Sequence, residues 1–196
     1  MDNATALRAK TADILTRLGA LRTGHFCLTS GRHSDKYMQC ARLFEHPKES
    51  EELCRDLAGL FGETFDLVAG PALGGIIMAY EVSRAIGVRN IFAERESGVM
   101  KLRRAFTAEP GAKILVVEDV VTTGGSVKEV IALLKELGAD VRGVGSIVNR
   151  SGGKADFGVP FHSLMILDAD TWTEEECPLC REGRPIVKPG SRTVKG

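Results

Sequence analysis

The 196-residue chain has no excess of charge of either sign and no long apolar run. Lysine plus arginine and aspartate plus glutamate number 26 each, so the formal net charge is +0, and nothing global favours nucleic acid or an anionic membrane. No run of about 18 apolar residues is present to span a bilayer, and the first residues lack the apolar centre of a signal peptide. We therefore expect a cytoplasmic protein that binds neither nucleic acid nor membrane, with any anion site formed locally.

The cysteines form an odd set without a secretion signal, which favours reduced thiols. They are Cys27, Cys40, Cys54, Cys177 and Cys180. Cys177 and Cys180 make a CPLC segment, whose spacing also suits a zinc half-site or a redox pair. Because the sequence shows neither a second CxxC nor paired histidines beside it, we expect no metal site built from protein side chains alone.

Apolar spacing along the chain predicts alternating helices and strands in one domain, 1–196. Helices are expected over 4–21, 49–61, 76–86 and 127–137, and strands over 67–70, 90–94, 113–119, 143–150 and 163–168. Continuous apolar runs suit strands that are buried on both faces of a parallel sheet. We predict a doubly wound, mostly parallel α/β sheet flanked by helices, with a helix and a small hood in 1–45 and an irregular tail over 172–196.

The segment 114–126 carries the most chemical information. A buried strand runs into two acids, Glu118 and Asp119, and then into a hydroxyl-rich turn that opens a helix. Such a turn presents backbone amides and hydroxyls to a phosphate, and acids beside it suit sugar hydroxyls or a metal. A phosphorylated sugar satisfies both parts, and the alternative is a pair of solvated acids followed by a polar helix cap.

The stretch EDVVTTGGS at 118–126 resembles the 5-phosphoribosyl 1-diphosphate motif of type I phosphoribosyltransferases. It has neither the ending of a Walker A loop nor the glycine spacing of a dinucleotide site. The resemblance implies that Glu118 and Asp119 hold the ribose hydroxyls. It assigns the rest of the donor site to the loop that follows, namely Val120, Val121, Thr122, Thr123, Gly124, Gly125 and Ser126.

The segment 70–76, GPALGGI, resembles the diphosphate loop of the same family. Small residues such as Ala72 and Gly74 let backbone amides approach a diphosphate closely, although a plain strand-to-helix turn would use similar residues. We favour diphosphate binding.

The acceptor base must be identified outside the shared motif. Residues 24–34, GHFCLTSGRHS, resemble the FxLxSGxxS signature of orotate phosphoribosyltransferases, and Arg150 sits where that family has a base-contacting arginine. An arginine fork suits the carboxylate of orotate, whereas the alternative is a solvated residue at a strand end. The resemblance adds Thr122, Tyr37 and Met38 to the orotate site.

Two histidines in the hood, His25 and His33, are also candidates for acid–base chemistry. We expect them to form hydrogen bonds or to pack within the hood and not to transfer a proton.

The segment 93–106 lacks the lysine-rich loop with a His-Gly that many orotate enzymes carry. Arg95 and Lys101 are the best matched cations, with Arg103 and Arg104 close behind. These cations suit a diphosphate, and a solvated basic face is the alternative.

The resemblance implies transfer of a phosphoribosyl group to orotate in pyrimidine (UMP) biosynthesis, with Asp119, Glu118 and Lys101 as catalytic residues. It also implies Mg²⁺ bound mainly through the substrate, and a homodimer that shares loop residues between subunits. Alternatives are a purine or uracil phosphoribosyltransferase, or a non-catalytic regulator of the same fold.

Overall fold

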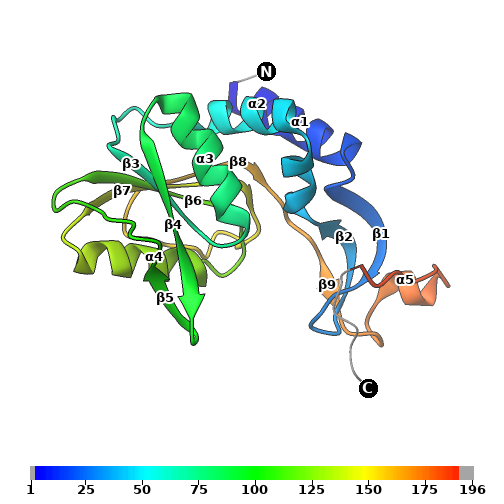
Figure 1. Ribbon diagram of the computed structural model, residues 1–196. Helices are drawn as coiled ribbons and strands as arrows, with labels where there is room; N and C mark the ends of the chain where they lie inside the picture. The colour runs from blue at the N-terminus through cyan, green and yellow to red at the C-terminus, as the bar shows by residue number, and fades with distance from the viewer. Residues whose placement is uncertain (1–2, 190–196) are drawn as a thin grey trace.

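The computed structural model describes residues 3–189 and contains a six-stranded sheet (Figure 1). The strands lie in the order β5-β4-β3-β6-β7-β8, and all are parallel to their neighbours except β5, which is antiparallel to β4. Their bounds are β3 Leu67–Pro71, β4 Arg89–Glu96, β5 Val99–Leu102, β6 Lys113–Val121, β7 Asp140–Asn149 and β8 Phe161–Ile166. The predicted mostly parallel α/β sheet is confirmed.

Helices cover both faces of this sheet. Their bounds are α1 Asn3–Arg17, α2 Pro47–Ala58, α3 Gly74–Ile86 and α4 Gly125–Glu136. Apolar residues of α1, α2 and α3 share one buried cluster, whereas those of α4 belong to a second cluster. Alternate residues of β6 enter the two clusters, with Leu115 and Val117 on the first side and Ile114 and Val116 on the second. This double burial explains the continuous apolar run.

A separate three-stranded sheet forms the hood, in the order β1-β2-β9 (Figure 1). Its strands are β1 Leu21–Cys27, β2 His33–Met38 and β9 Thr171–Trp172. The hairpin of β1 and β2 is antiparallel, and β9 adds to its free side after the chain leaves β8. A 3-10 helix, Cys40–Glu45, leads from the hood to α2.

The end of the chain differs from the irregular tail predicted over 172–196. Part of it forms β9 and the short helix α5, Pro178–Arg181, beside the hood (Figure 1). Val187 then exchanges backbone hydrogen bonds with β1, donating to the carbonyl of His25 at 2.8 Å and accepting from the amide of Cys27 at 2.9 Å. These hydrogen bonds join main-chain atoms, so the side chains of this segment gave no sign that it would pair with β1. Residues 190–196 lie outside the described part.

No helix within residues 3–189 has the length and apolar content needed to cross a bilayer. The five cysteines are free thiols in the structure.

Candidate active site

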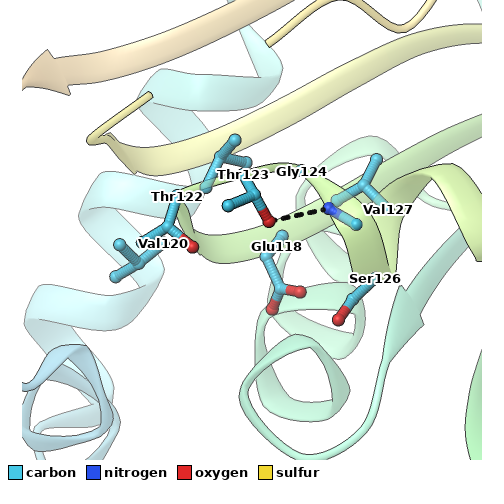
Figure 2. Close-up of a pocket in the computed structure, with 9 residues that line it drawn as sticks. Glu118, Val120, Thr122, Thr123, Gly124, Ser126 and Val127 are labelled. Atoms are coloured by element: carbon cyan, nitrogen blue, oxygen red, sulfur yellow. Dashed lines mark hydrogen bonds between the residues drawn. The ribbon is translucent and has the colours of Figure 1, made fainter. Parts of the chain in front are cut away.

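The carboxyl end of β6 passes through a short loop directly into α4, and this loop surrounds a pocket. Glu118 and the residues from Val120 to Val127 line the pocket, which has a volume of about 60 Å³. In Figure 2 the side chains of Glu118 and Ser126 extend to the same side of the loop. The hydroxyl of Thr123 accepts a long hydrogen bond, 3.4 Å, from the Gly125 amide (Figure 2). The residues of the predicted phosphate cradle therefore surround one small polar pocket at a helix N-terminus.

Gly124 gives this loop its shape for two reasons. Its φ of 76° lies in the left-handed region, which glycine adopts without steric cost. A Cβ at this position would also lie 2.8 Å from a ring carbon of Phe157. Phe157 thus supports the loop from behind, although nothing in the sequence marks this phenylalanine as part of the site.

Glu118 and Asp119 form a buried pair of acids beside the pocket. Asp119 accepts a hydrogen bond from the Val120 amide at 2.8 Å, and neither acid forms an ion pair within the described residues. Burial and, second, the charge of Asp119 raise the pKa of Glu118 to about 8. Burial also raises the pKa of Asp119. Two such carboxylates without a cation are suited to a positively charged or hydroxyl-bearing ligand.

The loop between β3 and α3 lies against this acid pair. A Cβ on Gly74 would lie 2.7 Å from the carboxyl carbon and from both carboxylate oxygens of Asp119. Gly70 and Gly75 also approach each other too closely for a side chain on Gly70. Gly74 of the predicted diphosphate loop is therefore brought next to Asp119, one of the two predicted ribose-binding acids. The sequence gives no direct sign of the contact between Gly74 and Asp119.

Arg150 follows β7 at the same edge of the sheet. Its backbone amide donates to the Val121 carbonyl at 2.7 Å, which fixes its backbone beside the residue that precedes Thr122. Partial burial lowers the pKa of the Arg150 guanidinium. No carboxylate within residues 3–189 forms an ion pair with Arg150. The site therefore contains a half-buried cation whose charge the described protein does not neutralise.

Tyr37 and Met38 lie in β2 of the hood. The Tyr37 ring packs against Phe26 with 5.6 Å between ring centroids, and it is partly exposed. The Met38 side chain is buried in the cluster that α1, α2 and α3 share. Of these two residues, only the Tyr37 side chain is accessible to a ligand, and its contact with a base stays a prediction.

The predicted loop cations lie on a β-hairpin made by β4 and β5. Arg95 forms two hydrogen bonds, 2.7 and 2.8 Å, with the carboxylate of Glu129 in α4. Lys101 pairs with Glu96 at 2.8 Å. The sequence does not indicate Glu129 as a partner, because it occupies an exposed helical position far along the chain.

The other two cations of this hairpin are also paired. Arg103 lies 3.3 Å from Glu96, and Arg104 lies 3.1 Å from Glu94. The ion pairs of Arg95, Lys101 and Arg103 with Glu129 and Glu96 are solvent-exposed, so each contributes little to folding and can be exchanged for a bound anion at small cost. Glu94, the partner of Arg104, is largely buried.

Comparison with known families agrees with this arrangement. Residues 39–175 match the model of the phosphoribosyl transferase domain. The chain belongs to the phosphoribosyltransferase family. The matched range contains the acid pair, the loop that follows it, the loop at 70–76 and Arg150.

Individual family members resemble the chain over nearly its whole length. It is 59% identical over 188 residues to an orotate phosphoribosyltransferase of Caldanaerobacter subterraneus, covering 95% of this chain and 99% of that one. It is 58% identical over 184 residues to the orotate phosphoribosyltransferase of Thermotoga maritima, covering 93% and 98%. A solved structure of Mycobacterium tuberculosis orotate phosphoribosyltransferase with 5-phospho-alpha-D-ribosyl 1-diphosphate is 28% identical, with a TM-score of 0.64, covering 82% and 96%.

Proposed function

We propose that this chain transfers the 5-phosphoribosyl group from 5-phosphoribosyl 1-diphosphate to orotate, releasing diphosphate and orotidine 5'-monophosphate. The observation that carries the proposal is the meeting of three features at one sheet edge. These are the amide-rich loop at 122–126, the acid pair without a cation, and the unneutralised Arg150. High identity to orotate phosphoribosyltransferases supports the same acceptor.

The donor is held in three parts. The amides and hydroxyls from Thr122 to Ser126, at the N-terminus of α4, bind the 5-phosphate. Glu118 and Asp119 accept hydrogen bonds from the ribose hydroxyls. The backbone at Ala72 and Gly74 approaches the diphosphate, and Gly74 lies directly against the Asp119 carboxylate.

The acceptor site follows from the charge of Arg150. Orotate carries a carboxylate, which uracil, hypoxanthine, guanine and adenine lack. A guanidinium binds a carboxylate through two parallel hydrogen bonds. A half-buried arginine that has no ion-pair partner within residues 3–189 gains most from such a ligand. Thr122 and Tyr37 complete the frame around the ring.

The reaction is a nucleophilic substitution at the anomeric carbon. Orotate N1 forms the new C–N bond and loses its proton, while the C–O bond breaks and diphosphate leaves with the bonding electrons. Positive charge develops on the ribose ring, where the Glu118 and Asp119 carboxylates stabilise it. The hairpin cations, Lys101 above all, offset negative charge on the departing diphosphate.

The acid pair also fits a nearby divalent cation, because neither acid has a cationic partner within residues 3–189 and a cation would favour the charged forms that burial disfavours. We propose that Glu118 and Asp119 would lie beside Mg²⁺ held mainly by the donor's diphosphate, where the ion would supply positive charge without a dedicated cage of protein ligands.

We further propose a cytoplasmic homodimer in which the hairpin cations act at the partner's site. Leu73, Ile77 and Tyr80 have helical spacing along α3 and are 83%, 47% and 56% exposed. Such an apolar stripe next to the diphosphate loop supports subunit contact there. Sedimentation analysis of a Tyr80→Glu variant should show a shift toward monomer relative to the unmodified chain.

A panel of bases tests the proposed activity. Purified chain is incubated with Mg²⁺, 5-phosphoribosyl 1-diphosphate and one base at a time, and diphosphate release is measured. We expect release with orotate, at least about 100-fold faster than with uracil, hypoxanthine, guanine or adenine, since a buried charge pair is lost with the other bases. Preference for another base would replace the acceptor assignment, and no release with any base would indicate a regulator.

A further inference from the structure

Four potential metal ligands meet in the hood, at a distance from the phosphate loop along the chain. His25 comes from β1, His33 from β2, and Cys177 and Cys180 from the start and body of α5. One ligand atom of each residue lies within 4.8 Å of those of the other three. The sequence predicts no histidines beside the CPLC segment, and the structure corrects this, because the hairpin and α5 lie side by side (Figure 1).

Four of the six distances among these atoms are close to those of a tetrahedral zinc site. The gap between His25 Nε2 and His33 Nδ1 is 3.1 Å. Cys177 Sγ and Cys180 Sγ lie 3.5 and 3.6 Å from His25 Nε2, and Cys180 Sγ lies 3.2 Å from His33 Nδ1. Zn–N bonds of about 2.0–2.1 Å and Zn–S bonds of about 2.3 Å at tetrahedral angles require about 3.3 Å between nitrogens and about 3.5 Å between nitrogen and sulfur.

Hydrogen bonds alone do not account for this convergence. His25 Nδ1 lies 2.9 Å from the Arg184 carbonyl, which can only accept, so Nδ1 carries the ring proton and Nε2 offers a single lone pair. Yet three groups crowd around that Nε2, namely His33 Nδ1, Cys177 Sγ and Cys180 Sγ. In metal sites, the ring nitrogen of a histidine that does not bind the metal usually donates its hydrogen to a backbone carbonyl or a carboxylate, as His25 Nδ1 does here.

Burial and charge point the same way. His25 is 4% exposed, His33 is 5% exposed and Cys177 is fully buried, whereas Cys180 is partly exposed, so three of the four ligands are shielded from water. Two thiolates and two neutral imidazoles around Zn²⁺ give a site of zero net charge, which can be buried without a counterion.

We propose that His25, His33, Cys177 and Cys180 bind a zinc ion that fastens α5 to the hood. The four ligands fill the coordination shell and leave no open position, which is typical of structural and not catalytic zinc. The hood is a small sheet in which β9 contributes only two residues, so it has little hydrophobic core of its own. A zinc cross-link between the β1–β2 hairpin and α5 would hold the end of the chain in place where that core is too small to do so. This site is independent of the proposed transferase activity.

Metal analysis of the purified full-length chain tests the proposal. The protein is grown with added zinc, purified under reducing conditions without chelators, and measured by elemental mass spectrometry. We expect about one zinc per chain, falling at least ten-fold in a Cys177→Ser, Cys180→Ser double variant. Cys27→Ser is the matched control, because Cys27 lies in the same hairpin outside the cluster, and its zinc content should be unchanged.

Cobalt substitution keeps the test decisive if the double variant fails to fold. Metal-free unmodified chain titrated with Co²⁺ should develop the visible absorption of tetrahedral cobalt and a thiolate charge-transfer band, both lost on adding zinc. A strong chelator should lower the melting temperature of the unmodified chain, and adding zinc back should restore it. Absence of zinc and of the cobalt spectrum would overturn the proposal, as would a Cys177–Cys180 disulfide in the freshly purified protein.

Discussion

Replacing Gly74 with alanine should damage the active site while leaving the fold intact. The new Cβ would lie 2.7 Å from the Asp119 carboxylate, whereas ordinary contact begins near 3.4 Å, so the carboxylate must move by the difference of 0.7 Å. A misplacement of about 1 Å in an active site can lower the rate on the order of 100-fold. We expect kcat/KM for 5-phosphoribosyl 1-diphosphate to fall 10- to 100-fold, which corresponds to about 1.4 to 2.7 kcal/mol of transition-state stabilisation.

Stability should hardly change in the same variant. Gly74 is the first residue of α3, and alanine is favoured over glycine within a helix by about 1 kcal/mol, which offsets part of the strain. Gly62→Ala is the matched control, since its Cβ would meet no atom within 4 Å. Steady-state kinetics and thermal melting of both variants provide the measurement. If Gly74→Ala keeps kcat/KM within two-fold of the unmodified chain, the close approach to Asp119 has no catalytic importance.

Three further substitutions probe the acceptor, the hairpin and the acid pair. Arg150→Gln should raise KM for orotate by about 10- to 100-fold while KM for the donor stays within two-fold, and equal rises in both would remove the carboxylate assignment. Lys101→Ala should lower kcat about ten-fold at saturating substrates, and unchanged constants would place Lys101 on a merely solvated face. Glu118→Gln should stabilise the ligand-free chain more at pH 9 than at pH 5, by up to about 4 kcal/mol, as measured by urea unfolding. The sign follows from a pKa that folding raises from 4.5 to about 8, because stability is then lost as pH rises through that interval. The same change at both pH values would show that Glu118 does not hold its proton in the folded chain.

Local sequence patterns were sufficient to predict the helices α1 to α4 and every strand of the six-stranded sheet except β5. Strand β6 shows why, since its alternate residues enter two different apolar clusters and must therefore all be apolar. The loop that follows carries its chemistry in adjacent residues, so Glu118 through Ser126 could be assigned together. The burial pattern of a strand and the residues of such a loop each depend on one short segment of chain, so they can be predicted from that segment alone.

Contacts between distant segments were not predictable in the same way. The pairing of β5 with β4, the support of Gly124 by Phe157 and the pairing of Arg95 with Glu129 join residues that no local pattern connects. The hood is where the structure differs most from what the sequence predicted. His25 and His33 are eight residues apart on facing strands and meet Cys177 only through the fold of the chain end.

A crystal structure of the chain with orotidine 5'-monophosphate would show whether the site binds this nucleotide as proposed. We expect the 5'-phosphate to accept hydrogen bonds from the amides of residues 122–126, with the ribose hydroxyls against Glu118 and Asp119. The carboxylate of the base should lie within hydrogen-bond distance of the Arg150 guanidinium. A phosphate bound elsewhere, or a base carboxylate facing away from Arg150, would contradict the assignment of this site.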